Sequence, residues 1–409
     1  MRESPYPLVN LEEAWRRIAA VVRLLPPVPL SLSEALGCVL AEDVVAREDL
    51  PPFPASAMDG YALIASDPAC ERRVIGEQDA GPDLGLRVPP GTAVRIMTGA
   101  PIPSGADAVL PVERAMEREG LVLPLEAVRS GQNVRPIGQD VTAGETVLVR
   151  GVSLGPAEIG LLASIGRATV LAHPKPRVAV LATGDELVPH DSVPGPGQIR
   201  NSNGPAIEAA VLSAGFHPVS LGLVGDNMDL LRAAILDGVA RADALLTCGG
   251  VSMGERDYVK PLLAELGTVH FGRVAVKPGK PLTFAEVRGV PVFGLPGFPV
   301  SSLVSFEVFA RPALRLMAGL RRLWRPEVEV RLEHHVRHDP DRVEFQRAVV
   351  TRREGVLWAA TTGVQASGRL RSLAGANALL RLPVGHSAFA AGTEVTALLI
   401  EQPEVDRLP

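Results

Sequence analysis

Lysine is scarce in this chain of 409 residues. Lysine and arginine together number 41, but only four are lysines: Lys175, Lys260, Lys277 and Lys280. Two of the four share one tetrapeptide, KPGK, which is flanked by a further proline. A lysine ammonium is a compact, strongly hydrated charge, whereas the arginine guanidinium is a flat fork. We therefore interpret 245–302, which contains this tetrapeptide, as a set of loops that binds an oxyanion.

Cysteine, excess basic charge and long apolar runs are also lacking. The three cysteines are isolated, without a CxxC pair, which favours neither a disulfide framework nor a zinc site. Acidic residues outnumber basic ones by 46 to 41, which argues against a general nucleic-acid-binding surface. No apolar run reaches the roughly 18 residues that span a bilayer, and the N-terminus lacks a signal-peptide pattern. We expect a soluble, cytoplasmic protein with neither nucleic acid nor membrane as a partner.

Several standard catalytic motifs are absent. The chain has no GxxxxGK[ST] phosphate loop, no GxGxxG after a strand, no HExxH and no GxSxG. The length exceeds what one hydrophobic core usually supports, so about two to four domains are expected. The hydrophobic fraction of 46% is ample for packed cores.

The first part of the chain alternates between helical and turn-rich stretches. Asn10 predicts a capped helix over 10–25, and Ser31 predicts a second capped start. From about 50 to 140, proline, glycine and short alternating runs indicate a small β domain with many turns. Residues 144–172 return to a helical pattern, so we expect them to pack with the segment near Ser31, with the β domain inserted between the two.

Residues 175–317 alternate between apolar runs and helical patterns, which is typical of a doubly wound α/β fold. Four phrases, TGDE, GDN, CGGVS and LPGFP, directly follow predicted strands. Because ligands bind beyond the carboxyl ends of parallel strands, we expect these phrases to form one site. The tail from about 327 alternates as half-buried strands do, which predicts a second β domain.

Three acids and two lysines of these loops are candidate site residues: Glu186, Asp226, Asp257, Lys277 and Lys280. Two cations alone indicate an oxyanion site, and carboxylates beside it would repel the anion unless a divalent cation lay between them. Mg²⁺ held by one or two carboxylates and by substrate phosphates fits this mixture. The alternative is that the acids cap helices, because Asp and Glu favour the first helical turn. Spacing alone leaves both open.

Other candidates are weaker on spacing alone. It favours a turn role for Asp59 in PASAMDGYA and Asp140 in RPIGQD, and a surface position for Arg347 and Ser367. The tail also contains three histidines, His334, His335 and His338. We do not expect them to bind a metal, because alternation along a strand puts neighbouring side chains on opposite faces.

Eight phrases in order carry a resemblance that covers essentially the whole chain. They are ASAMDGYA, TGAPIPSGADAV, the GQD of RPIGQD, KPRVAVLATGDEL, TCGGVSMGERDY, KPGKP, GLPGFPVSS and DRVEFQR. Together they resemble the molybdopterin molybdenumtransferases, the MoeA family, which is related to the E domain of gephyrin. The resemblance implies insertion of molybdenum from molybdate into adenylylated molybdopterin with Mg²⁺, with release of AMP, in the last step of molybdenum cofactor biosynthesis. It also implies a homodimer, and a MogA-type adenylyltransferase as a candidate partner.

The same resemblance implies an α/β multidomain fold. We expect a helix-containing linker domain (27–46 plus 141–173), an inserted small β domain (47–140), a central MogA-like doubly wound α/β domain (7–26 plus 174–326) and a C-terminal β domain (327–409).

Matching motif to motif, the resemblance implies roles for single residues. Catalysis would involve Asp59, Asp140, Glu186 and Asp257, the first two from the partner subunit's inserted β domain. Molybdate, a tetrahedral dianion, would be held by Lys277, Lys280, Ser301, Arg347 and Ser367. Adenylylated molybdopterin would contact Thr98, Thr183, Gly249, Gly250, Ser252, Asp226, Pro296 and Gly297. Mg²⁺ would bind Glu186, Asp226 and Asp257.

Two residues depart from the family pattern. Phe298 stands where the family usually has Asn in LPGNPVS, and Cys248 precedes GGVS in place of Ser or Thr. Both keep the loop geometry, so we expect activity to be kept. Two alternative functions remain, a molybdopterin adenylyltransferase and a non-enzymatic gephyrin-like scaffold. The first would have no use for 50–140, and the second would call for a long Pro/Ser linker or fused module, which we do not find.

Overall fold

A computed structural model describes residues 6–251 and 258–405 of the chain. The chain divides into two compact units. The first consists of Met1–Val28, Gly37–Val39 and His173–Pro409, and the second of Pro29–Leu36 and Leu40–Ala172. Across the described residues, no helix is both long and apolar enough to cross a bilayer.

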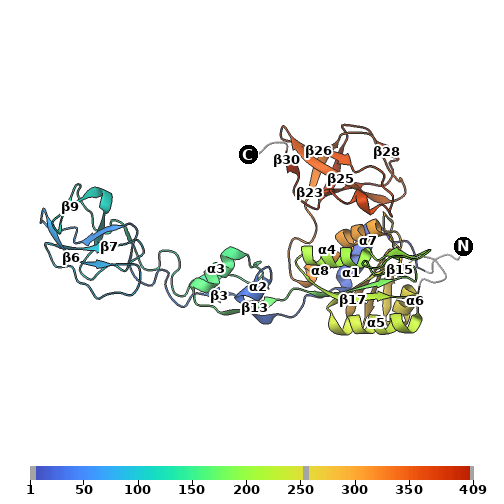
Figure 1. Ribbon diagram of the computed structural model, residues 1–409, viewed down its shortest axis with the longest axis horizontal. Coiled ribbons are helices and arrows are strands. Elements are labelled where there is room, and N and C mark those ends of the chain that lie inside the picture. Colours follow the sequence, from blue (N-terminus) through green and yellow to red (C-terminus); the bar gives the residue numbers. More distant parts are fainter. Residues whose placement is uncertain (1–5, 252–257, 406–409) are drawn as a thin grey trace. The chain divides into compact units, whose positions relative to one another are not determined.

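The first unit contains a six-stranded sheet covered by helices on both faces (Figure 1). In sheet order its strands are β17 (His217–Val224), β14 (Arg177–Thr183), β18 (Ala244–Cys248), β22 (Val290–Leu295), β21 (Thr283–Val287) and β19 (Thr268–Phe271). One face packs on α1 (Leu11–Val21), α4 (Asn203–Ser213), α7 (Pro299–Ser305) and α8 (Arg311–Met317), with a π-helical turn, η2 (Phe306–Ala310), between the last two. The other face packs on α5 (Met228–Arg241) and α6 (Val259–Leu266).

Strand β14 shows why these residues form a central strand. Val178 and Val180 are buried in the cluster formed with α1 and α4, and Ala179 and Leu181 in the cluster formed with α5 and α6. A strand covered on both faces is continuously apolar in sequence. The predicted helix start is also confirmed, because the Asn10 side chain accepts a hydrogen bond of 2.7 Å from the backbone N–H of Glu13.

The six-stranded sheet is mixed, whereas the sequence pattern predicted a parallel one. Strands β17, β14, β18 and β22 run parallel, so their carboxyl ends meet at one edge. Strand β21 runs antiparallel to both of its neighbours, β22 and β19. The cause is the turn between β21 and β22, where Arg288 and Gly289 both have positive φ, at 52° and 82°. Such a short connection joins only antiparallel strands.

The C-terminal part of the first unit forms a closed barrel. Strand β25 pairs with β26, and pairing continues through β23, β29 and β27 back to β25. The bounds are β23 (Glu327–Leu332), β25 (Val343–Arg353), β26 (Val356–Thr361), β27 (Ala378–Leu382) and β29 (Glu394–Leu399). Small apolar side chains such as Val350, Ala359 and Ala397 fill its core, and closure removes the edges of an open sheet. The predicted alternation at β23 and β29 is confirmed.

Short elements complete the barrel. Strand β20 (Val276–Lys277) pairs in parallel with β25, with Val276 opposite Val343 and Lys277 opposite Glu344. The remaining elements are β24 (Val336–Arg337), which pairs with β28 (Ala388–Phe389), η3 (Leu370–Ser372), and β30 (Glu404–Val405), which also pairs with β25. The KPGK tetrapeptide therefore begins within the barrel sheet and leads back into the α/β sheet.

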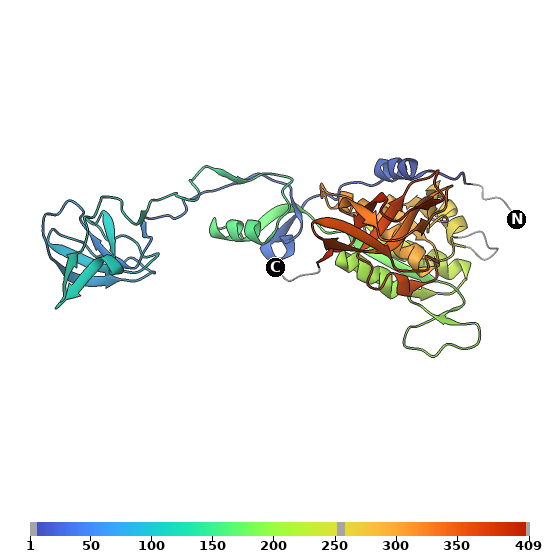
Figure 2. The ribbon, with the colours of Figure 1, turned by 90° about the horizontal axis from the view of Figure 1, so that it is seen from above.

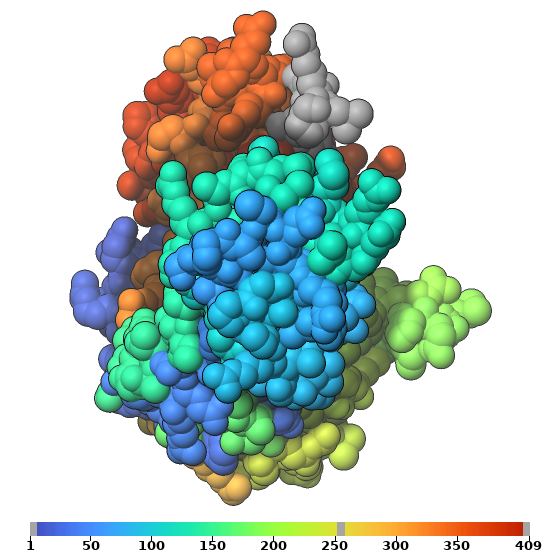
Figure 3. Space-filling model, turned by 90° about the vertical axis from the view of Figure 1, so that its left-hand side faces the viewer, coloured from blue at the N-terminus to red at the C-terminus, as the bar shows by residue number. Residues whose placement is uncertain are grey.

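The second unit contains the predicted small β region, one face of which is in front, in blue to teal, in Figure 3. Its six-stranded sheet has the order β8 (Ala108–Pro111), β5 (Gly60–Leu63), β7 (Thr92–Ile96), β6 (Arg72–Gln78), β10 (Leu121–Pro124) and β9 (Ala115–Arg118). The chain adds η1 (Val112–Arg114), the pair β4 (Ala55–Ser56) with β11 (Val134–Arg135), and the pair β3 (Val44–Val45) with β12 (Thr146–Leu148). A three-stranded sheet contains β1 (Val28–Ser31), β13 (Thr169–His173) and β2 (Val39–Leu40). Helices α2 (Leu32–Ala35) and α3 (Pro156–Ser164) contact each other. This confirms that the helical stretch in 144–172 packs with the segment near Ser31.

Candidate active site

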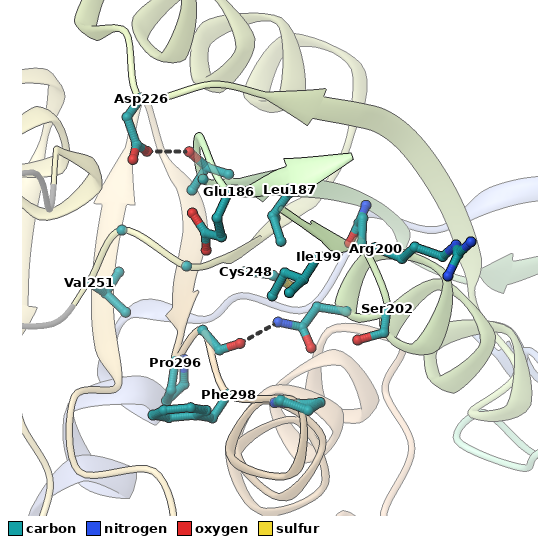
Figure 4. A pocket seen from close by; sticks show the side chains of 18 of the residues that line it. Glu186, Leu187, Ile199, Arg200, Ser202, Asp226, Cys248, Val251, Pro296 and Phe298 are labelled. Atoms are coloured by element: carbon teal, nitrogen blue, oxygen red, sulfur yellow. Dashed lines mark hydrogen bonds between the residues drawn. The ribbon is translucent and has the colours of Figure 1, made fainter. Parts of the chain in front are cut away.

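A pocket lies at the carboxyl ends of the parallel strands of the first unit (Figure 4). Its volume is about 470 Å³, and all four predicted loop phrases contribute to its walls. Thr183 ends β14, and Gly184 and Glu186 follow it. Asp226 follows β17, 248–251 end and follow β18, and 296–298 follow β22. We call this cavity the strand-end pocket. The expectation that these phrases lie together at one edge of the sheet is confirmed.

Two of the predicted acids, Glu186 and Asp226, lie on one side of the strand-end pocket, with Pro296 on the other (Figure 4). Asp226 accepts hydrogen bonds from Thr183 Oγ1 at 3.3 Å and from the backbone N–H of Asp185 at 3.4 Å. In return, the N–H of Asp226 donates to Asp185 Oδ1 at 2.8 Å. This reciprocal pairing fixes the loops after β14 and β17 together. Sequence reasoning did not select Asp185, although the TGDE phrase contains it.

The donor set of the pocket fits a hard cation. Glu186 is exposed and Asp226 is partly buried, and Mg²⁺ in proteins is held by one or two carboxylates together with substrate phosphates and water. Among the described residues, no group of three or more His, Cys, Asp or Glu side chains is placed to hold a metal ion. The third predicted acid, Asp257, and the predicted substrate contact Ser252 fall in 252–257, outside the described residues.

Glycine is required in the loop after β18. Gly249 has φ of 105°, and a Cβ there would lie 2.5 Å from the carbonyl oxygen of Thr183. Gly250 has φ of 65°, and a Cβ there would lie 2.6 Å from a methyl carbon of Val259. An L side chain would therefore be strained at either position. This wall of the pocket is made of main chain, which allows a ligand to approach the backbone closely.

The loop after β22 is held by side chains from two helices. Ser302 of α7 donates a hydrogen bond to the carbonyl of Pro296, and Asn203 of α4 donates to the carbonyl of Gly297 at 2.6 Å. The other amide atom of Asn203, Oδ1, is buried and has no hydrogen-bond partner within the described part of the chain. Asn203 was not among the predicted site residues. Its place in the run RNSNGP, just after a strand, was the available signal.

A two-stranded ribbon forms a further wall that the sequence did not predict. It consists of β15 (Leu187–Val188) and β16 (Ile199–Arg200), and the loop between them projects from the α/β part (Figure 2). Leu187, Ile199 and Arg200 all line the pocket. The Arg200 guanidinium donates to the carbonyl of Ser192 at 3.0 Å and points away from the cavity (Figure 4). The ribbon therefore contributes mainly apolar surface to the pocket.

The two departures from the family pattern both line the strand-end pocket but differ in exposure. The Phe298 side chain is 62% exposed and lines the pocket, and its ring would lie 3.5 Å from a Cβ built on Gly368. Cys248 is buried at the end of β18. Burial raises the pKa of its thiol to about 12, so the thiol stays protonated at neutral pH and is not a nucleophile. Phe298 can contact a ligand, whereas Cys248 has a packing role.

A second cavity of about 470 Å³ lies beside the barrel, and we call it the histidine cavity. Its lining includes Lys277, His334, His335, Arg337, His338, Glu344, Gln346, Gln365 and Ala366. Lys277 Nζ lies 3.3 Å from Glu344 Oε1. Lys280 is exposed, and within the part of the chain that the structure describes its ammonium forms no hydrogen bond or ion pair. Ser301 is 4% exposed near the start of α7, and Val300 next to it donates to the carbonyl of Ser367 at 3.1 Å.

Arg347 holds the loop that carries Ser367. Its side chain is only 1% exposed and donates to Ser372 Oγ at 3.0 Å and to the carbonyls of Gln365 and Ala366 at 3.4 and 3.3 Å. Burial lowers its pKa to about 10, so the guanidinium remains charged at neutral pH. In this structure the N–H groups of Arg347 point at the loop that carries Ser367, and the guanidinium charge lies beneath that loop.

The remaining predicted residues belong to the second unit. Asp59 accepts hydrogen bonds from the Oγ1 and the backbone N–H of Thr98, at 2.6 and 2.7 Å. These two bonds, that from the side chain first, lower the pKa of Asp59 from its ordinary value. Asp140 is exposed, and its backbone N–H donates to the carbonyl of Leu50 at 2.9 Å.

Three family models match successive parts of the chain. They are the MoeA N-terminal region (domain I and II) over 9–166, a probable molybdopterin binding domain over 179–316, and the MoeA C-terminal region (domain IV) over 329–400.

Curated relatives match along nearly the whole chain. It is 38% identical over 405 residues to molybdopterin molybdenumtransferase 2 of Mycobacterium tuberculosis, covering 94% of this chain and 98% of that protein. It is 34% identical over 413 residues to molybdopterin molybdenumtransferase of Bacillus subtilis, covering 98% and 95%. Gephyrin of Dictyostelium discoideum is 37% identical over 423 residues, and 91% of this chain spans 59% of that longer protein.

Solved structures agree with the fold. A crystal structure of a molybdopterin biosynthesis MoeA protein from Pyrococcus horikosii superposes with a TM-score of 0.79 at 30% identity, covering 97% of this chain and 100% of that one. The predicted α/β multidomain fold is thereby confirmed.

Proposed function

Because the chain belongs to the MoeA family of molybdopterin molybdenumtransferases, enzymes of molybdenum cofactor biosynthesis, we propose that it inserts molybdenum from molybdate into adenylylated molybdopterin. Mg²⁺ is required and AMP is released. The observation that supports this most is the strand-end pocket, in which backbone-lined loops and two carboxylates meet at one sheet edge. Such an edge is where α/β sheets bind ligands.

We assign the adenylylated substrate to the strand-end pocket. Glu186 and Asp226 would hold Mg²⁺ with Asp257, and Mg²⁺ bound there would neutralise the phosphate oxygens of the substrate. Thr183 and Asp185 orient the Asp226 carboxylate through hydrogen bonds at 3.3 and 3.4 Å. Gly249 and Gly250 give the loop after β18 the positive-φ backbone conformation that lines this pocket.

We assign molybdate to the segments around KPGK and the loop at Ser367, with Lys277, Lys280, Ser301, Arg347 and Ser367 as its ligands or supports. Two ammonium groups, a guanidinium and two hydroxyls supply the positive charge and the directed donors that a tetrahedral dianion takes. The buried Arg347 supports this site through the carbonyls of Gln365 and Ala366, which precede Ser367. The backbone N–H of Val300 joins the same loop to α7.

We further propose that the enzyme acts as a homodimer and that Asp59, Asp140 and Thr98 take part in the reaction. Asp59 is suited to such a role because it is exposed and ionised, and because Thr98 fixes its orientation. Cleavage of the phosphoanhydride then depends on positioning and on electrostatic stabilisation by these groups, with little covalent chemistry by side chains.

A direct test measures AMP release and molybdenum incorporation with purified protein, adenylylated molybdopterin, Mg²⁺ and molybdate. We expect AMP release that requires both Mg²⁺ and molybdate, with product that contains molybdenum. Adenylylation of molybdopterin by MgATP, without AMP release, would instead identify an adenylyltransferase. Absence of both reactions would contradict an enzymatic role and favour a scaffold.

A further inference from the structure

We propose that Glu344, supported by His338, is a positioning residue that holds the Lys277 ammonium where molybdate binds. This proposal rests on the proposed function, because it takes Lys277 to be a molybdate ligand. Glu344 and His338 have no role in the site as described so far. Both belong to the barrel, whereas Lys277 begins the KPGK tetrapeptide.

The backbone brings the carboxylate and the ammonium together. Lys277 of β20 and Glu344 of β25 are opposite each other in a parallel pair. Lys277 Nζ lies 3.3 Å from Glu344 Oε1, and Glu344 Oε2 lies 3.1 Å from His338 Nδ1. The three side chains therefore form one continuous chain of contacts from the barrel to the wall of the histidine cavity.

Burial differs sharply along this chain of contacts. The exposed fractions of the side chains are 0% for His338, 3% for Glu344 and 39% for Lys277. A carboxylate that is almost fully removed from water is costly unless cationic or N–H donors surround it. Glu344 is therefore committed to its donors. Lys277 is the member of the three whose ammonium is open to the cavity.

Both oxygens of Glu344 have close polar partners. Glu344 accepts a hydrogen bond from the backbone N–H of Asp339 at 2.9 Å, forms an ion pair with Lys277, and shares a hydrogen bond with His338 Nδ1. The other ring nitrogen of His338, Nε2, faces the carbonyl of Pro383 at 2.7 Å, and a carbonyl only accepts. Glu344 is thus held from both sides, by Lys277 at Oε1 and by Asp339 and His338 at Oε2, and the Lys277 side chain lines the cavity.

This arrangement has a consequence for anion binding. A free lysine side chain loses rotamer freedom when it grips a ligand, and a side chain ordered beforehand loses less. Glu344 takes one N–H of Lys277, which leaves the other two for an incoming oxyanion. Arg337 lines the same cavity and adds to its positive character.

Glutamine cannot replace Glu344, although it has the same shape. One amide orientation would set its NH₂ against the Lys277 ammonium, and the other would set it against the N–H of Asp339. In Glu344→Gln we therefore expect the molybdate concentration for half-maximal AMP release to rise about tenfold. We expect the maximal rate at saturating molybdate and the affinity for adenylylated molybdopterin to remain unchanged.

A double-mutant cycle on the full chain separates positioning from general stability. If Glu344 acts through Lys277, then Glu344→Gln should have no further effect on the molybdate titration in a Lys277→Met background. Gln346→Ala serves as the matched control. Gln346 lies on the same strand, is 4% exposed, lines the same cavity and donates to the carbonyl of Arg337 at 2.7 Å. Its loss should lower stability without moving the titration.

The outcomes distinguish the two levels of the argument. If Lys277→Met weakens molybdate dependence and Glu344→Gln does not, the positioning role is overturned and the proposed function stands. Equal effects of Glu344→Gln with and without Lys277 would also overturn it, because they indicate a purely structural role. An unaltered titration in Lys277→Met would remove Lys277 from the molybdate site and the positioning role with it. If Glu344→Gln does not fold, His338→Gln is measured instead, and a rise in the half-saturating molybdate concentration is expected there too.

Discussion

The strand-end pocket and the histidine cavity have the same volume, about 470 Å³ each, but opposite linings. The first is walled by glycine, proline and main chain, with an exposed carboxylate (Glu186) and a partly buried one (Asp226) that accepts from hydroxyl and backbone donors. The second is walled by histidine, arginine and lysine, with a carboxylate buried behind them. One chain thus contains an acidic cavity that suits a cation and a phosphate-bearing ligand, and a basic cavity that suits a bare anion.

The difference shows how each cavity is held in shape. Backbone conformation shapes the strand-end pocket, because Gly249 and Gly250 adopt positive φ. Buried ionic contacts shape the histidine cavity, because Glu344 and Arg347 direct the groups around them. Substitutions should therefore affect the two ligands separately, and the following experiments test that separation.

The largest effect is expected for Asp226→Asn. The amide would keep the contact with Thr183 but remove one of the two carboxylates described in the strand-end pocket. We expect the rate of AMP release to fall about a hundredfold and the Mg²⁺ concentration for half-maximal rate to rise. The molybdate concentration for half-maximal rate should change little. Asp243→Asn is the control, since Asp243 pairs with Arg177 at 3.3 Å at the opposite edge of the same sheet. An equal loss in both variants would contradict a local role.

A smaller effect, confined to the basic cavity, is expected for Arg347→Lys. Lysine cannot reproduce the three directed hydrogen bonds to Ser372, Gln365 and Ala366. We expect a loss of about 2 kcal/mol in the free energy of unfolding, together with weaker molybdate dependence and unchanged nucleotide binding. Denaturant unfolding and a molybdate titration measure these. Arg352→Lys, at an exposed position of the same strand, should leave both values unchanged.

A smaller effect still is expected for Phe298→Asn, which restores the usual family residue. The exposed ring lines the strand-end pocket, where it can stack on a flat heterocycle. We expect the KM for adenylylated molybdopterin to rise about fivefold, with no change in the molybdate titration. Phe298→Tyr keeps the ring and should retain the parent KM. A raised KM in both variants would remove stacking as the cause.

The smallest effect is expected for Thr98→Val. This variant tests a third carboxylate, Asp59, which is held by the neutral hydroxyl of Thr98. The variant removes the side-chain hydrogen bond that lowers the pKa of Asp59, so that pKa should rise towards its ordinary value. Because the folded pKa is lowered, this interaction stabilises the fold above the ordinary Asp range, and the stabilisation disappears as pH falls through the folded pKa. NMR titration of the Asp59 carboxyl measures the shift. An unchanged value would exclude the hydroxyl as the cause.

The strand-end pocket could largely be predicted from the sequence, because local signals determine it. Apolar runs that end in TGDE, GDN, CGGVS and LPGFP identified the strand ends, and parallel pairing brings such ends together. The caps at Asn10 and Asn227 depend on contacts a few residues away. The hairpin at Arg288-Gly289 was not predicted, although its signal is also local. Strands and helices were expected to alternate there.

The histidine cavity could not be predicted in the same way, because it depends on contacts distant in sequence. Nothing near Lys277 indicates that β20 pairs with β25 and faces Glu344. The resemblance implied that Arg347 contacts molybdate. Its burial beneath the 365–366 carbonyls depends on the pairing of distant strands in the barrel, which the sequence does not show. Alternation correctly predicted strands in the tail but not which strands meet.

Strand β20 has a practical consequence for dissecting this protein. The C-terminal family model begins at 329, so a fragment cut at that boundary would lack Val276 and Lys277, and the first residues of β25 would lose their neighbour. An exposed, unpaired strand edge of this kind promotes self-association. Sequence comparison therefore delimits the barrel without β20, although β20 belongs to its sheet. A fragment meant to contain the whole barrel sheet has to include Val276 and Lys277.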